Sequence, residues 1–203
     1  MVAAGLAPSL IGLVGLLVTA AVGQEVPEAS SAQAEGLDKK LQALVARYGE
    51  GKADEMQFEI SQAEANAYLR HRMGDRLPKG IRAPWVRFET GAIHAGAELD
   101  VALLGELMVS SPLEQLFSGH VPVELRARFQ GEEGVGKMDL EQFTLSGIPL
   151  PKSYVQQIAA TFSKSPSRPD GIRLEEPFPL PFGIRSARVL EGRVLLRQGV
   201  SKY

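Results

Sequence analysis

Alternation of apolar and polar residues between positions 81 and 145 restricts the fold more than any other feature of this sequence. Two stretches, 93–103 and 121–129, carry apolar side chains at every second position. Successive side chains of a β-strand point to opposite faces, so each stretch predicts a strand with one buried and one solvated face. The turn at Thr90-Gly91 predicts a hairpin, and the GEEGVG segment reads as a second hairpin turn.

The alternation changes parity near Gln142, because Met138 and Leu140 are followed by Phe143 and Leu145. One extra residue in a strand shifts all later side chains to the other face, so this change predicts either a β-bulge or a change of the buried face near Gln142. A further pair of strands is expected at 184–190 and 194–196, around a Glu191-Gly192 turn.

Helical periodicity occurs in three other segments. Apolar residues at spacings of three and four predict helices over 37–48 and 154–162. Ser61, with Glu64 three residues later, forms the pattern of a capping box and predicts a helix that runs to Met73. A short strand, 56–60, precedes that helix. These elements predict an α+β domain, over residues 37–203, in which long antiparallel strands wrap against one or two helices.

The N-terminal segment is apolar up to the first acidic residue, Glu25. Residues 1–23 are interpreted as a signal peptide, with Ala21 and Gly23 near a cleavage site, or as a retained membrane anchor. The small, polar and acidic residues 24–36 predict a flexible spacer. Both interpretations place the rest of the chain outside the cytoplasm, in the periplasm or on the outer face of the membrane; a buried N-terminal helix is the third reading.

Charge and cysteine content exclude several classes of function. The chain has 22 basic and 24 acidic side chains, a net charge of -2, which gives no general attraction for nucleic acid. It has no cysteine, so disulfide frameworks, thiolate nucleophiles and cysteine zinc sites are excluded. His71, His94 and His120 stand in separate elements, and no metal site, cofactor motif or catalytic motif is recognised.

The order of segments resembles the bacterial TULIP-like lipid-binding proteins, most nearly the YpmS type. The resemblance rests on FEISQAEANAYL (58–69), the 81–103 hairpin, the strands around Leu125 and Leu140, SGIPLPKSYVQQI (146–158) and the closing hairpin. It covers about residues 37–197, and its motifs are made of packing and turn residues. What it implies is a strongly curved antiparallel sheet folded round a helix, with an apolar groove that shelters acyl chains and no catalytic centre.

The resemblance makes lipid, or another amphipathic small molecule, the expected partner. The residues expected to line the groove are Leu99, Val101, Leu103, Leu125, Phe129, Leu140, Tyr154, Ile158 and Phe162. The same residues also suit an ordinary closed core, because an apolar stripe has the same pattern in both cases.

A basic segment is the second candidate site. Six basic residues against Asp75 alone fall between positions 70 and 87, together with the single tryptophan. The residues expected to contact lipid headgroups are Arg70, Arg72, Arg76, Arg82, Trp85 and Arg87. Guanidinium groups grip phosphate in a bidentate fork, and indole suits the headgroup level of a membrane. A solvated charged face is the alternative.

Three functions from different classes follow. The first is a non-catalytic, extracytoplasmic protein that binds or transfers lipid. The second is a structural or scaffolding domain of the cell envelope with the same fold and a closed core. The third is a hydrolase that uses Ser118 and His120, whose spacing in a loop carries little information. The sequence favours the first.

Overall fold

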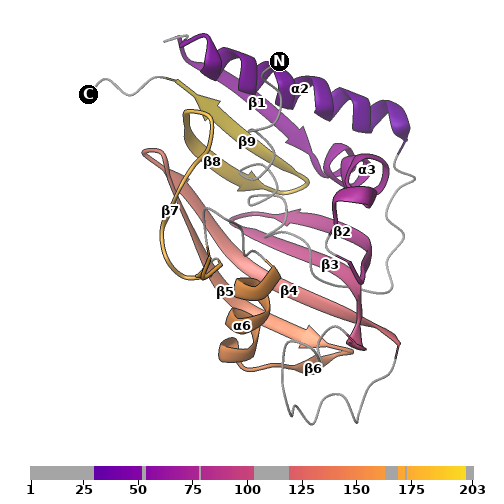
Figure 1. Ribbon diagram of the computed structural model, residues 1–203. Coiled ribbons are helices and arrows are strands. Elements are labelled where there is room, and N and C mark those ends of the chain that lie inside the picture. The colour runs from indigo at the N-terminus through magenta and orange to yellow at the C-terminus, as the bar shows by residue number, and fades with distance from the viewer. Residues whose placement is uncertain are drawn as a thin grey trace.

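The computed structural model describes residues 30–51, 54–77, 79–102, 119–162, 169–171 and 173–199. It shows an α+β fold in which one strongly curved antiparallel sheet carries helices at both ends (Figure 1). The predicted α+β class and the strongly curved antiparallel sheet are therefore confirmed. The interpretation of residues 1–23 as a leader or anchor falls outside the described residues.

The sheet has nine strands in the described part of the chain. Their bounds are β1 Met56–Ser61, β2 Ile81–Glu89, β3 Ala92–Asp100, β4 His120–Glu132, β5 Val135–Leu145, β6 Ile148–Pro149, β7 Phe178–Pro179, β8 Ile184–Leu190 and β9 Arg193–Gln198. The main path runs β1-β9-β8-β4-β3-β2, and β5 pairs β4, β6 and β7. All of these pairings are antiparallel, as the hairpin turns predict.

The bulge predicted near Gln142 is present. Arg126 pairs with Gln142, whereas the next residue, Ala127, pairs with Leu140. Glu141 is therefore the extra residue, and it returns Phe143 and Leu145 to the buried face.

A glycine permits the closest crossing in the sheet. β4 and β8 pair only at Gly131 and Ala187, where a Cβ on Gly131 would lie 2.9 Å from the Ala187 Cβ. The absent side chain lets the two strands cross, and the crossing joins the two halves of the curved sheet.

The helices are α2 Ser31–Gly49, α3 Gln62–Arg72 and α6 Lys152–Phe162, with a short 3-10 helix η1 at Gly74–Arg76. α2 and α3 lie at one end of the sheet, and α6 lies at the other (Figure 1). Ser61 and Glu64 form the predicted capping box of α3.

The first helix begins earlier than predicted. The spacer expected over 24–36 is wrong for residues 31–36, which form the first turns of α2; residues 24–29 lie outside the described residues. Ser30 and Gln33 form a capping box at the start of this helix, and Ala34 is fully buried against Ala67 of α3. Small residues in this segment serve close helix packing, a role that composition does not distinguish from a flexible linker.

The core lies on the concave face of the sheet. Alternate residues of every long strand point into it, including Ile93, Leu99, Val123 and Leu145, each at most 4% exposed. The predicted strand through Leu103 ends at Asp100, and Leu103 itself lies outside the described residues.

Candidate functional site

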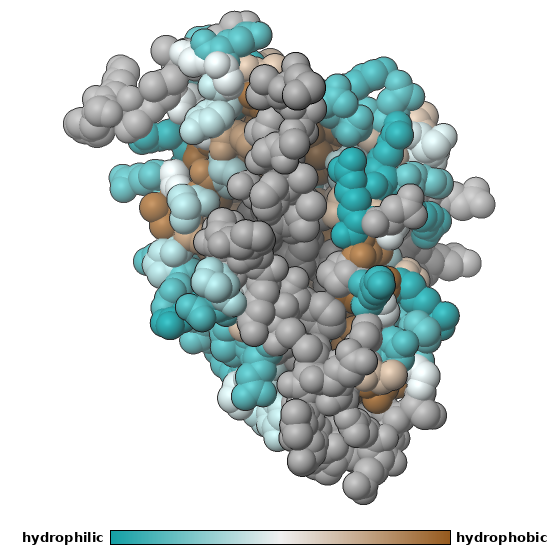
Figure 2. Space-filling view, in the orientation of Figure 1, coloured by the Kyte–Doolittle hydropathy of each residue, from teal (hydrophilic) through white to brown (hydrophobic). Residues whose placement is uncertain are grey.

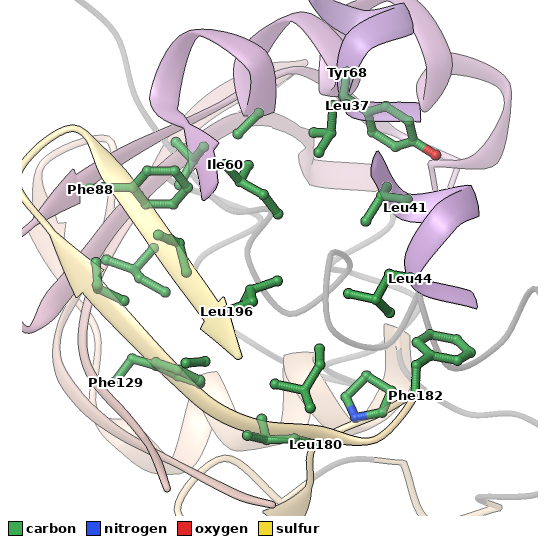
Figure 3. Close-up of a pocket in the computed structure, with 18 of the residues that line it drawn as sticks. Leu37, Leu41, Leu44, Ile60, Tyr68, Phe88, Phe129, Leu180, Phe182 and Leu196 are labelled. Carbon is green, nitrogen blue, oxygen red and sulfur yellow. The ribbon is translucent and has the colours of Figure 1, made fainter. Parts of the chain in front are cut away.

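An apolar cavity lies between α2, α3 and the concave face of the sheet. Its volume is about 130 Å³. Figure 3 shows side chains from both helices and from the strands pointing into the same space. Its walls are Leu37, Leu41 and Leu44 of α2; Ala65, Tyr68 and Leu69 of α3; Ile60, Val86, Phe88, Ile93, Phe129, Met138, Ile184, Ala187, Val189, Val194 and Leu196 of the strands; and Leu180, Pro181 and Phe182 before β8.

The chemistry of these walls is uniform, since every lining side chain is apolar or aromatic. A water molecule needs two to four polar partners to stay in a cavity, and these walls do not supply them. An apolar cavity of about 150 Å³ stays dry and accepts a ligand of the size of benzene. The cavity therefore suits a six-carbon apolar group rather than water.

The helix α2 forms one wall of the cavity and packs most closely on α3. Polar contacts hold it at three places. Arg47 donates to the Asp54 carbonyl at 3.1 Å and lies 3.0 Å from the Asp54 carboxylate, just before β1. Lys40 Nζ donates to the Glu59 carbonyl and to Glu64 Oε1, both at 2.7 Å. The buried Gln198 side chain of β9 donates to the carbonyl of Leu44 at 2.7 Å. The wall is thus held by packing on α3 and by these polar contacts.

The helix α3, on which α2 packs, is itself hydrogen-bonded to the edge strand β2. The Asn66 side chain donates to the Val86 carbonyl at 2.7 Å and accepts from the Val86 N–H at 2.8 Å. Gln62 accepts from the N–H of Phe88 at 2.9 Å. Because no strand in the described part of the chain pairs with this side of β2, the two amides satisfy backbone groups that would otherwise lack a partner.

Tyr68 stands at the border of the cavity. Its ring lines the space, and its hydroxyl points away from the centre (Figure 3). Burial raises the pKa of Tyr68, and the carboxylate of Asp38 raises it further, whereas Arg76 and Arg72 act to lower it. One acidic and two basic side chains thus act on the ionisation of the hydroxyl.

Of the residues predicted to line a lipid groove, Phe129 lines this cavity. Leu99, Val101, Leu125 and Leu140 are buried in the core, at most 8% exposed, and Tyr154 packs against it. Leu103 lies outside the described residues, as do the side chains of Ile158 and Phe162 in α6. A lipid contact for the residues other than Phe129 stays a prediction.

The residues predicted to contact headgroups form two groups. Arg82 pairs with Glu98, and Arg87 lies over the Trp85 ring, 5.9 Å from its centroid, on the strand β2. Trp85 in turn meets His94 edge to face. Arg70, Arg72 and Arg76 are exposed on α3 and η1, and none has an ion-pair partner within the described ranges.

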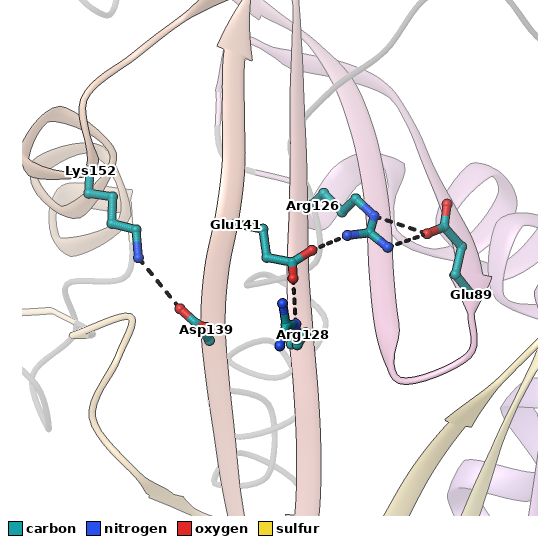
Figure 4. Close-up of polar contacts among 6 residues, drawn as sticks. All are labelled: Glu89, Arg126, Arg128, Asp139, Glu141 and Lys152. Atoms are coloured by element: carbon teal, nitrogen blue, oxygen red, sulfur yellow. Dashed lines mark hydrogen bonds and ion pairs between the residues drawn. The ribbon is translucent and has the colours of Figure 1, made fainter.

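The remaining charges on the sheet are largely paired. On the face opposite the core, Arg126 bridges Glu89 and Glu141, and Arg128 also contacts Glu141 (Figure 4). Lys152 of α6 reaches Asp139 and Glu175. These exposed pairs tie neighbouring elements together and leave little free charge there.

Figure 2 shows mainly hydrophilic residues along both flanks of the visible face, with small hydrophobic patches among them. No cluster of three metal-ligating side chains occurs among the residues placed by the structure. None of the described helices has the length and hydropathy needed to span a membrane. Ser118, one of the two residues of the hydrolase hypothesis, lies outside the described residues.

Comparison with family models, curated proteins and solved structures gives no match.

The sequence correctly predicts that most residues of the cavity wall are buried. It does not predict that they surround an empty space. The stripe of Leu37, Leu41 and Leu44 predicts a helix with one buried face, and the alternation predicts the buried face of each strand. Neither pattern predicts the distance between the buried face of the helix and the buried face of the sheet. The two capping boxes mark where α2 and α3 begin, and the hydrogen bonds of Asn66 to Val86 tie α3 to β2.

Proposed function

We propose that this chain is an exported, extracytoplasmic protein that binds the apolar part of a lipid or similar amphipathic molecule in the cavity beneath α2, without catalysing a reaction. The observation that carries the proposal is the entirely apolar lining of a cavity that the helix α2 closes on one side. Close packing is the rule in protein interiors, so a space of this size and character calls for an occupant.

The volume of the cavity limits the affinity. Each buried methylene contributes about 0.8 kcal/mol, so a six-carbon group contributes about 5 kcal/mol, which corresponds to a millimolar to submillimolar Kd. A micromolar Kd, about 8.2 kcal/mol, needs roughly ten methylenes. A tail of that length needs more room than about 130 Å³, and a shift of α2 is the change that supplies it.

The test is a pair of measurements on the full chain purified from a membrane-containing host. Native mass spectrometry reports any lipid that stays bound, and the neutral fluorescent probe N-phenyl-1-naphthylamine reports access to the cavity. We expect one bound ligand per chain and saturable uptake of the probe.

Two matched variants locate the binding. Ala65→Leu adds three carbons inside the cavity, whereas Ala46→Leu makes the same change on the exposed side of α2. We expect probe affinity to fall about tenfold or more in Ala65→Leu, because filling removes space for two or more methylenes, and to stay unchanged in Ala46→Leu. Val194→Phe fills the cavity from β9 and provides a second variant should Ala65→Leu fold poorly.

Absence of both bound lipid and probe uptake would overturn the proposal. The domain with a closed core, structural or scaffolding in role, would then be the better account. Equal loss of affinity in the Ala65→Leu and Ala46→Leu variants would also count against it, because binding would then occur elsewhere than in the cavity.

A further inference from the structure

The face of α3 that lines the cavity also carries an exposed arginine, Arg72, just beyond the cavity wall. Ala65, Tyr68 and Leu69 line the cavity, and Arg72 follows Tyr68 by four residues. Side chains four apart in a helix lie on the same face, one turn along. Arg72 therefore stands one turn beyond the cavity wall, and Arg76 follows in η1.

The arginines at this end lie outside ion-pair distance of any carboxylate in the described part of the chain, although Arg72 helps to lower the pKa of Glu35 on α2. Elsewhere Arg82, Arg126 and Arg128 lie against carboxylates. Arg72 and Arg76 are exposed and have no ion pair within the described part of the chain. The hydroxyl of Tyr68 points out of the cavity, and both arginines act on its ionisation.

Building on the function proposed above, we infer that the ligand is an anionic amphiphile whose carboxylate or phosphate head is held by Arg72 and Arg76 beside the Tyr68 hydroxyl while its tail enters the cavity. Guanidinium groups bind both heads in a bidentate fork, and phenol supplies one more donor. The cavity walls offer the head no partner, so a charged head must stay at the border.

Three neighbouring features oppose the anion and sharpen the test. The carboxylate of Asp38 raises the pKa of Tyr68, and Arg72 helps to lower the pKa of Glu35, so both carboxylates of α2 act against a negative head. The C-terminal end of α3 carries partial negative charge, and Arg72 also stabilises the helix by offsetting it. The measurement must therefore be one that a change in helix stability does not affect.

That measurement is the ratio of affinities for two ligands with the same tail. Dodecanoate and dodecanol differ only in the charge of the head, and isothermal titration at pH 8 in physiological salt measures both on the full chain. We expect dodecanoate to bind about tenfold more tightly than dodecanol, the factor that one additional charge-assisted hydrogen bond supplies. Acetate, a head without a tail, should show no measurable binding.

The variants assign the preference to residues. Arg72→Gln/Arg76→Gln should bring the ratio close to one and leave the affinity for dodecanol unchanged. Arg185→Gln/Arg188→Gln removes the same charge from β8 and should keep the ratio. Tyr68→Phe, which keeps the ring, should lower the ratio about threefold for one neutral hydrogen bond, and Asp38→Asn should raise it.

Each contrary result has a distinct meaning. Failure of dodecanol, dodecanoate and N-phenyl-1-naphthylamine to bind overturns both proposals. Equal binding of the two dodecyl ligands overturns the anionic head and leaves the apolar cavity in place. A ratio that survives in Arg72→Gln/Arg76→Gln, together with weaker sedimentation on phosphatidylglycerol vesicles, assigns the arginines to a membrane surface instead. Tight binding of acetate assigns them to a free anion.

Discussion

Asn66 is a buried polar residue that holds a helix to the edge of the sheet. It is 3% exposed, and its amide makes three hydrogen bonds, to Gln62 and to both backbone groups of Val86. An edge strand normally leaves such groups to water or to another chain. Here a side chain takes the place of the missing strand and also fixes the α3 wall of the cavity.

Asn66→Ala tests this role. The variant leaves the N–H and C=O of Val86 buried without partners, and each unpaired group costs about 1–3 kcal/mol. We expect the free energy of unfolding to fall by roughly 3 kcal/mol, measured by urea denaturation. Gln62→Ala, which removes the single bond to Phe88, is the control and should cost about 1 kcal/mol. Equal losses in the two variants would show that Asn66 acts only as a helix residue.

At the scale of elements, Glu64 connects three segments. Its carboxylate accepts from the backbone and hydroxyl of Ser61, completing the α3 cap, and from Lys40 of α2. Lys40 also bonds the carbonyl of Glu59 in β1. The ionised carboxylate of Glu64 therefore links the N-terminal cap of α3 to the position of α2. Burial by itself raises the pKa of Glu64, but the hydrogen bonds from Lys40 and Ser61 lower it by more, so the pKa lies below its usual range.

Because the pKa of Glu64 is lowered in the folded protein, the direction in which its contribution to stability changes with pH is known. A carboxylate whose pKa is lower in the folded state stabilises the fold above the unfolded pKa, about 4.3. That contribution is lost as the pH falls through the folded pKa. We expect Glu64→Gln, which can still cap, to be roughly 1 kcal/mol less stable than the parent at pH 7, in urea denaturation, and this difference to shrink as the pH falls below the unfolded pKa. A pH-independent difference between the two proteins would contradict the role of the charge.

At the scale of the whole molecule, the cavity and the expected ligand differ in size. The space of about 130 Å³ accepts a six-carbon group, whereas useful affinity needs a tail of roughly ten carbons. Within each half of the sheet, the strands that form the floor are joined by ladders of hydrogen bonds, and the two halves meet at Gly131 and Ala187. α2 is instead held by contacts such as those of Lys40 and Gln198, so it is the wall expected to move.

A distance measurement tests this movement. The chain has no cysteine, so Ala43→Cys on α2 and Lys137→Cys on β5 give two unique, exposed sites for spin labels. We expect the label distance from pulsed electron spin resonance to change when dodecanol binds and to stay constant when hexanol, with half the carbons, binds. Bound dodecanol with an unchanged distance would show that the tail finds room elsewhere, without displacement of α2.

Local patterns in the sequence determine most of the elements. Alternation specifies the long strands and their buried faces, the Ser61 and Glu64 pair begins α3, and the change of parity near Gln142 locates the bulge at Glu141. Each of these signals lies within a few neighbouring residues, because strand alternation and capping are set by local backbone geometry. The sequence pattern does not predict the start of α2, because small, polar residues are equally common in linkers and in closely packed helices.

Only the tertiary structure decides where the helices stand over the sheet. The bond between Gln198 and the carbonyl of Leu44 joins residues 154 positions apart, and no local pattern reports such a contact. An apolar side chain gains by leaving water whether it meets a packed core or the wall of a cavity, so the sequence pattern is the same in both cases. The separation of Arg72 from Arg82 arises in the same way, because the chain turns between α3 and β2 and places Arg82 beside Glu98. The sequence therefore determined which faces are buried, and the packing of distant elements determined which of those faces enclose the cavity.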